Sequence, residues 1–245
     1  MYKYLIILCS VLCSGCFVRS VYTPITQNTP LFSRTKQLNA AGYIGSNHIE
    51  LQAAHNPVKH MAIGANINYG AGLATYEALA GYYGYNSKAS WRYEILGGYG
   101  YNTNYSYQKN IPSLFNGKNV DYEVNSVYNK LYIQPAVGYF GEIKMYKIHF
   151  SFSASVRVGY NLFNTYSYKE IDTLNTPIVN KQYSNSSLFT IEPCITNKVG
   201  IKNINAVLQL QSISPYSKQI DVSYTRFSPG LLLSIGIEYQ LKFKY

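Results

Sequence analysis

The sequence predicts an all-β protein, an antiparallel up-and-down transmembrane β-barrel of about ten strands with short periplasmic turns and longer external loops. Three observations lead to this fold class. Apolar and polar residues alternate over long segments, short connections alternate with long ones, and the chain ends on an aromatic residue inside an alternating segment. Successive side chains of a strand point to opposite faces, so alternation without helical periodicity favours strands.

Ten alternating segments are found, and many exceed the roughly 5 or 6 residues of a typical soluble strand. A tilted strand needs about 9–11 residues to cross a bilayer. The predicted strands are 38–45, 48–55, 61–69, 76–85, 91–101, 128–140, 147–162, 188–197, 202–212 and 230–245.

Connection lengths favour a membrane barrel over a soluble one. The turns after the second, fourth, sixth and eighth segments are short, whereas residues 102–127, 163–187 and 213–229 form long connections. Outer-membrane barrels have short periplasmic turns and longer external loops, which places both ends of the barrel domain in the periplasm. A soluble barrel would also alternate, but its apolar faces would point inward.

The N-terminus has the features of an export signal. An apolar run from Leu5 to Leu12 is too short to span a membrane, and Ser14 and Gly15 precede Cys16. This arrangement resembles a bacterial lipoprotein signal, which implies cleavage before Cys16 and acylation of its thiol. Plain secretion with cleavage elsewhere is the alternative. We therefore divide the chain into a signal peptide (1–15), a lipid-anchored periplasmic tether (16–37) and a barrel domain (38–245).

Further stretches resemble a known family. The run from Tyr22 through Pro24 and Pro30-Leu31-Phe32, followed by Ile49-Glu50-Leu51-Gln52-Ala53-Ala54, looks like the outer-membrane β-barrel lipoproteins of the Bacteroidota. The resemblance implies a fold and an outer-membrane location, and it gives no function. Surface lipoproteins of those bacteria carry acidic residues after the Cys, and residues 17–20 lack them, which favours an inward-facing anchor.

The last segment resembles the C-terminal strand that the outer-membrane insertion machinery reads in such barrels. Its alternating outward positions end on an aromatic residue. They are Tyr239, Leu241, Phe243 and Tyr245.

The polar faces of the predicted strands carry both signs of charge. The predicted lumen charge network comprises Glu50, Arg92, Glu94, Arg157, Glu192, Glu238 and Lys242. A structural ion-pair network is one interpretation. A narrow polar conduit in which Arg92 and Arg157 face the glutamates is the other.

The expected function is non-enzymatic, in envelope structure, surface adhesion or restricted passage of small solutes. The alternative is a periplasmic soluble β-barrel lipoprotein that binds an apolar ligand inside. No catalytic, metal or cofactor site is predicted, because no His accompanies the loop Asp residues as a rim hydrolase would need. The charge of +10 is scattered, so we expect no nucleic-acid partner. Expected partners are outer-membrane lipid, the insertion machinery and surface glycans, with possible O-glycosylation at Thr173.

Overall fold

The structure, a computed structural model, describes residues 22, 25–44, 48–70, 72–86, 88, 90–112, 119–143, 148–171, 177–220 and 232–243. No helix within these ranges is long and apolar enough to cross a bilayer. The strands are β1 (Gln37–Ile44), β2 (His48–His55), β3 (Met61–Gly70), β4 (Leu73–Tyr85), β5 (Trp91–Pro112), β6 (Asn119–Ile143), β7 (Ile148–Ile171), β8 (Pro177–Ile201), β9 (Ile204–Gln211), β10 (Ser214–Tyr216) and β11 (Leu232–Lys242).

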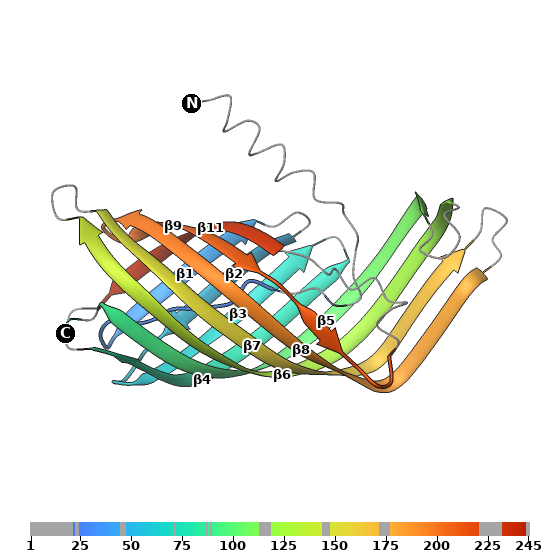
Figure 1. Ribbon diagram of the computed structural model, residues 1–245, viewed down its shortest axis with the longest axis horizontal. Coiled ribbons are helices and arrows are strands. Elements are labelled where there is room, and N and C mark those ends of the chain that lie inside the picture. The colour runs from blue at the N-terminus through green and yellow to red at the C-terminus, as the bar shows by residue number, and fades with distance from the viewer. Residues whose placement is uncertain are drawn as a thin grey trace, which may run out of the picture.

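Ten of these strands close into an antiparallel barrel (Figure 1). Strands β1 to β8 pair in sequence order, β8 pairs with β9, and β9 pairs with β11, which returns to β1. The short strand β10 adds to β8 beyond the end of β9. The predicted up-and-down barrel of about ten strands is confirmed.

The two ends of the barrel differ. At the short-turn end, brief turns join β2 to β3, β4 to β5, β6 to β7 and β8 to β9, and β11 ends there beside the start of β1. At the opposite end, which we call the hairpin end, β5 to β8 continue far past their neighbours (Figure 1). The C-terminus lies at the short-turn end.

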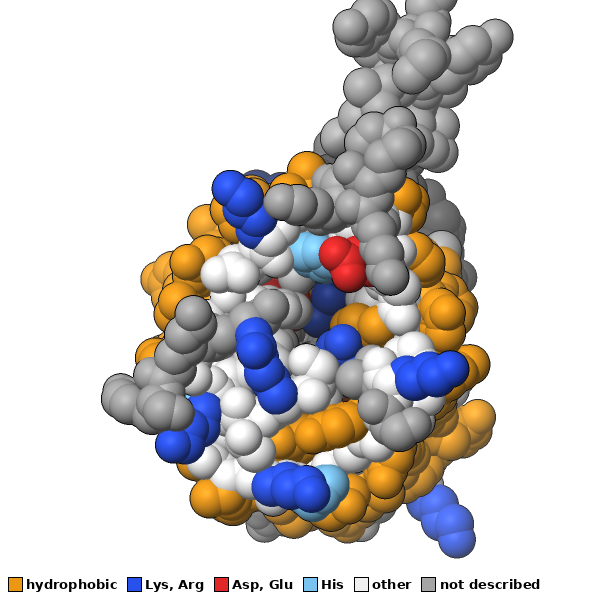
Figure 2. Space-filling view, turned by 90° about the vertical axis from the view of Figure 1, so that its left-hand side faces the viewer, with side chains coloured by type: hydrophobic (Ala, Val, Ile, Leu, Met, Phe, Trp, Pro, Cys, Tyr) orange, Lys and Arg blue, Asp and Glu red, His pale blue; other side chains and the backbone are white. Residues whose placement is uncertain are grey.

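Apolar side chains point outward from the wall and polar side chains point inward. In β2, Ile49 and Leu51 are 61% and 59% exposed, whereas Glu50 between them is fully buried. The same alternation continues in the other strands, so the rim seen from the short-turn end is surrounded by apolar groups (Figure 2). The alternative prediction of a soluble barrel with an apolar interior is therefore wrong, because the apolar side chains point outward.

Aromatic residues gather near both ends of the apolar exterior. Those toward the short-turn end are Tyr82, Trp91, Tyr93, Tyr139, Phe152 and Phe243, and those toward the hairpin end are Tyr69, Tyr76, Tyr99, Tyr101, Tyr160 and Phe189. Aliphatic residues such as Ile133 and Ile237 lie between the two groups. Tyr128 does not join them, because it points into the barrel and is 1% exposed. The distribution matches the aromatic girdles of membrane barrels.

The long connections predicted at 102–127 and 163–187 are wrong. They are mostly strand, because β5 and β6 have 22 and 25 residues and β7 and β8 have 24 and 25. We call the four-stranded part beyond the β3–β4 turn the extension; it comprises residues 105–112, 119–125, 167–171 and 177–182. Its base is marked by the backbone hydrogen bond from Tyr105 N–H to Gly72 O, 2.6 Å long. Of the third connection, residues 212–220 are described and contain β10.

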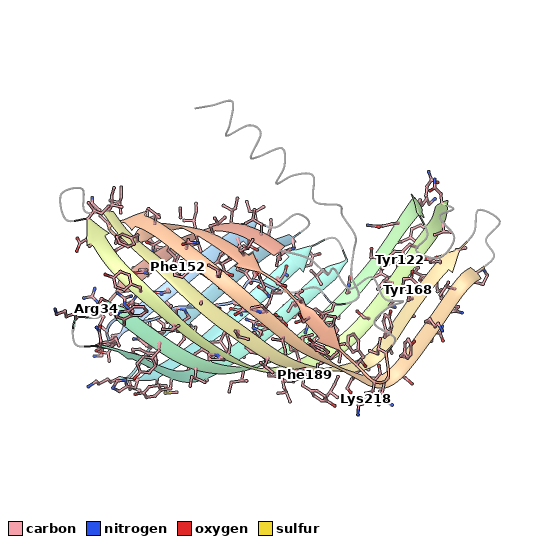
Figure 3. The ribbon with its side chains drawn as sticks, in the orientation of Figure 1. Arg34, Tyr122, Phe152, Tyr168, Phe189 and Lys218 are labelled. Carbon is pink, nitrogen blue, oxygen red and sulfur yellow. The ribbon has the colours of Figure 1, made fainter. Side chains whose placement is uncertain are left out.

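The inner face of the extension carries a group of buried apolar and aromatic side chains. Tyr122 and Tyr168 come from neighbouring strands, and their ring centroids lie 5.2 Å apart (Figure 3). They belong to one buried cluster at the hairpin end with Tyr128, Phe163, Leu188, Ile213, Ile220 and Tyr22. Tyr22 precedes the first strand, so this cluster ties the N-terminal part of the chain to the hairpin end.

Candidate functional site in the barrel lumen

Residues 25–32, which we call the lumen segment, run through the inside of the barrel. Every residue of this segment is buried. The sequence predicts that residues 16–37 form a periplasmic tether. Part of that range, residues 25–32, instead fills the lumen of the barrel.

The wall binds the backbone of the lumen segment at six consecutive carbonyl oxygens. Each carbonyl of residues 26–31 accepts a hydrogen bond from a side chain of a different strand. The donors, in order, are Gln52, Gln209, Gln134, Lys198, Asn39 and Arg92, at 2.7 to 3.1 Å. Buried backbone groups need partners, and here the wall side chains supply what a neighbouring strand would.

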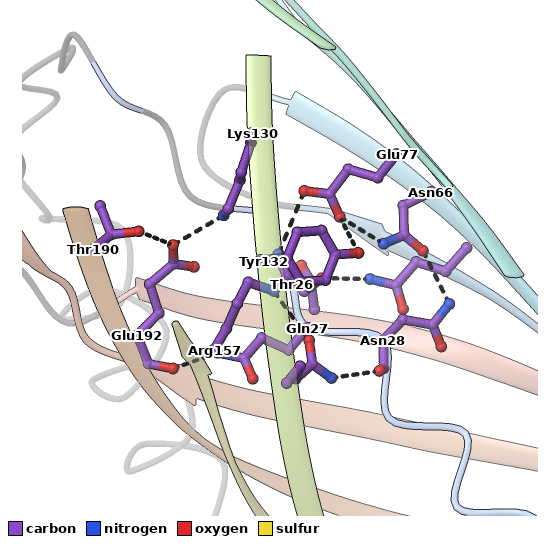
Figure 4. A network of polar contacts seen from close by, with 12 residues as sticks. Thr26, Gln27, Asn28, Asn66, Glu77, Lys130, Tyr132, Arg157, Thr190 and Glu192 are labelled. Atoms are coloured by element: carbon purple, nitrogen blue, oxygen red, sulfur yellow. Dashed lines mark hydrogen bonds and ion pairs between the residues drawn. The ribbon is translucent and has the colours of Figure 1, made fainter. Parts of the chain in front are cut away.

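Glutamine and glutamate side chains also accept hydrogen bonds from three N–H groups of the lumen segment. Gln209 accepts from Gln27 N–H at 3.1 Å through its Oε1 and donates to the carbonyl of the same residue. Glu50 accepts from Thr26 N–H at 3.0 Å, and Glu94 accepts from Leu31 N–H at 2.8 Å. The side chain of Asn28 donates to Asn66 at 2.9 Å (Figure 4). The wall thus binds both acceptors and donors of the lumen segment's backbone.

Ion pairs surround the lumen segment. Lys130 contacts Glu192 at 2.9 Å (Figure 4). The Tyr22 hydroxyl also hydrogen-bonds to this glutamate. Lys198 contacts Glu238 at 2.6 Å. All of these charged groups are buried.

A further pair lies across the barrel. Arg157 Nη1 is 3.5 Å from Glu77 Oε1, and its guanidinium lies 4.4 Å from the ring centroid of Tyr132. Tyr132 in turn donates to Glu77 at 3.1 Å. A glycine makes room for this ring, because a Cβ on Gly98 would meet Tyr132 Cζ at 2.2 Å.

Five of the seven residues predicted as a lumen charge network point into the lumen, and their ion pairs differ from those that the conduit interpretation supposed. Glu50, Glu94, Arg157, Glu192 and Glu238 point inward and are buried. Arg92 is half-buried near the short-turn end, where its guanidinium stacks 3.4 Å from the Phe140 ring centroid. The cationic partners of Glu192 and Glu238 are Lys130 and Lys198. The side chain of Lys242 lies outside the described residues.

Sequence reasoning missed Glu77, Lys130 and Lys198 as members of the network. The alternation contained the signal for two of them, since Lys130 shares the inward parity of Gln134, and Glu77 shares that of Leu79. Lys198 lies one residue past the predicted end of its strand. The role of residues 25–32 had no local signal.

The remaining predicted positions divide into two groups. Tyr239, Leu241 and Phe243 point outward on the last strand, at 43%, 37% and 44% exposure. Cys16, Thr173 and Tyr245 lie outside the described residues. Cys194 is a buried free cysteine in β8.

A basic cavity of about 830 Å³ opens at the short-turn end (Figure 2). Its charged lining residues are Arg34, Lys88, Arg92, Lys198, Lys202 and Glu142. Arg92 and Lys198 also hold carbonyls of the lumen segment, so the cavity meets this segment at its inner end. Within the described ranges, no group of three His, Cys, Asp or Glu could hold a metal ion.

No protein-family model matches the chain, and no curated protein matches it. Among solved structures, the chain is similar to one titled "KdgM porin", with 9% identity and a TM-score of 0.34. That match covers 85% of this chain and 99% of the other. The strand pairing itself establishes the fold.

Proposed function

We propose that this protein is an outer-membrane β-barrel that anchors and displays its extension at the cell surface, with a lumen closed by its own N-terminal segment. The exposed apolar wall between the two groups of aromatic residues supports the membrane location, because such a wall is stable in contact with lipid. Envelope structure and adhesion are the roles consistent with a closed lumen.

One observation supports the proposal that the lumen is closed. Six consecutive carbonyls of residues 26–31 are bound by six different strands, and a pore would leave these wall side chains facing water. Solute passage would require the lumen segment to leave, with loss of these bonds. We propose a non-enzymatic role, and passage is the outcome that the experiment must exclude.

Conductance in a planar bilayer tests the proposal. The full-length protein should insert without discrete current steps, and a variant lacking residues 25–32 should conduct. A Gln134→Leu/Gln209→Leu variant keeps the segment but leaves two carbonyls unpaired, at about 1–3 kcal/mol each, so intermittent openings are expected. Gln182→Leu, in the extension, is the matched control and should remain closed. Steady conductance of the unmodified protein would instead favour restricted passage, and failure of every form to insert would overturn the membrane location.

A further inference from the structure

The basic cavity at the short-turn end gathers positive charge around one opening (Figure 2). Its volume of about 830 Å³ lies within the range of small-molecule pockets, about 300–1,000 Å³. The cationic side chains that line it come from distant parts of the sequence and converge only in the folded barrel. They are Arg34, Lys88, Arg92, Lys198 and Lys202.

Two of these cations are fixed where the cavity meets the lumen segment. Arg92 stacks 3.4 Å from the ring centroid of Phe140 and donates to a carbonyl of the lumen segment at 3.1 Å. Lys198 is 5% exposed, contacts Glu238 at 2.6 Å and donates to another carbonyl of the segment at 3.1 Å. Both side chains are therefore held in place before any ligand binds, which lowers the cost of binding.

The other three cations are exposed at the rim, on backbone that is hydrogen-bonded in place. Lys88 lies in a turn closed by a hydrogen bond from Asn86 N–H, 3.0 Å long. Lys202 lies in the short turn between β8 and β9, and the carbonyl of Arg34 accepts a hydrogen bond from Asn56 (Figure 3). Within the described part of the chain, none of these three side chains forms an ion pair.

The lining carries more positive charges than negative ones. Glu142 and the Glu238 that pairs with Lys198 offset two of the five cations, so three positive charges remain in excess. A cleft lined by one sign of charge concentrates ions of the opposite sign. The cavity therefore favours an anion with two or more negative charges.

The donors of the cavity suit a phosphate group. Such a group presents three acceptor oxygens around one atom and carries about 1.5–2 negative charges at pH 7. Arginine binds it through two parallel hydrogen bonds, and lysine binds it as a point charge. The cavity offers both residue types, and the hydroxyls of Ser33, Ser90 and Ser151 line it as further donors. A planar carboxylate, with two oxygens, would engage fewer of these groups.

We propose that the basic cavity is a binding site for a small soluble anion that bears phosphate groups. The site goes beyond the proposed function, because it lies at the opposite end of the barrel from the extension and does not require a closed lumen. A lipid headgroup is the other source of a phosphate. It would reach the exposed rim, whereas Lys198 lies inside the barrel.

Calorimetric titration of the full-length protein in non-ionic detergent at low salt tests the site, with inorganic pyrophosphate as the probe. The native protein should bind it, and Arg34→Gln/Lys202→Gln should weaken the affinity by about tenfold or more, because each lost contact is a hydrogen bond between charged groups. Lys169→Gln/Lys181→Gln, in the extension, removes the same charge and should bind like the native protein. Heat-modifiable gel migration checks that all forms are folded. Absent binding by the native protein, or equal weakening in the control, would overturn the site.

A substitution in the opposite direction separates binding from damage to the fold. Glu142→Gln removes the acidic residue from the rim and should tighten pyrophosphate binding by about two- to fivefold. The matched control is Glu123→Gln in the extension, which should leave the affinity unchanged. An affinity that does not rise in Glu142→Gln would contradict an anion seated in the cavity.

Two further probes identify the anion. Citrate, which carries carboxylates alone, should bind more weakly than pyrophosphate, and equal affinity would overturn the phosphate assignment. Phosphatidylglycerol added to the micelles should not displace pyrophosphate. Displacement by this lipid would assign the rim to lipid headgroups and overturn the soluble ligand.

Discussion

Several buried charges in the barrel interior are paired with an opposite charge on another strand. Lys130 on β6 pairs with Glu192 on β8, and Arg157 on β7 reaches Glu77 on β4 while donating to Gln134 at 3.0 Å. A lone buried charge is costly, whereas a paired and hydrogen-bonded one is tolerated. These pairs link strands that are not neighbours in the wall, so they cross-brace the barrel around the lumen segment.

Lys130→Met should destabilise the barrel by about 3–5 kcal/mol, because it leaves the buried Glu192 carboxylate without its cation. Adding Glu192→Gln should recover part of this loss. The matched control is Lys169→Met, whose half-exposed pair with Glu123 at 3.5 Å should contribute less than about 1 kcal/mol. Urea midpoints in detergent micelles, read from heat-modifiable gel migration, give the comparison. Equal losses in the two single variants would contradict it.

At the scale of elements, the extension carries an irregularity that a side chain stabilises. The pairing of β5 with β6 shifts between Gln108 and Ile111, and Asn110 has a φ of 55°. Asp121 on β6 accepts a hydrogen bond from Asn110 N–H at 3.1 Å and from the Tyr107 hydroxyl at 2.7 Å. One carboxylate thus fixes a bulge in an exposed hairpin.

These contacts give the extension a pH dependence. The hydrogen bond from Tyr107, with that from Asn110, holds the pKa of Asp121 below its usual value. A carboxyl whose folded pKa is lowered stabilises the fold above its unfolded pKa, near 3.9, and this contribution is lost as pH falls through the folded pKa. Tyr107→Phe should raise the pKa of Asp121 in a side-chain NMR titration, and Tyr105→Phe should leave it nearly unchanged. An unshifted pKa in Tyr107→Phe would show that this bond is not formed in solution.

Alternation predicted the elements that lie in the wall and failed beyond it. It gave β2 at its observed bounds, His48–His55, because apolar and polar side chains face lipid-like and polar surroundings in turn. In the extension, inward Ser106 is polar but inward Tyr122 is aromatic, as is outward Tyr107, so no single polarity marks either face of the strands. The lumen segment was not predictable for another reason. Its partners are as distant as Gln209, 182 residues from Gln27, and they bind backbone atoms that every residue has.

At the scale of the whole molecule, the apolar outer surface indicates whether water or lipid surrounds the barrel. Ile237 is 65% exposed midway along β11, and Ile143 is 48% exposed at the short-turn end of β6. In water, neither residue would be penalised for becoming charged. In a bilayer, lysine costs about 2–4 kcal/mol at the midplane and about 0–1 near an interface.

Ile237→Lys should therefore destabilise the protein in lipid vesicles by about 2–4 kcal/mol, and Ile143→Lys by less than about 1 kcal/mol. Denaturant unfolding in vesicles measures both variants under the same conditions. A loss that does not depend on depth would mean that the wall does not face lipid.

The threaded lumen segment makes the molecule a lasso, a tail passed through a ring that the same chain forms. The ring is closed where Gln37 to Ile44 pair with Ile235 to Lys242, and the tail joins the ring directly at Gln37. Folded chains avoid passing segments through loops, because the order of events then becomes restrictive. We therefore expect the two edge strands to pair around a tail already in place, with the pairing of β1 and β11 as the last step of assembly.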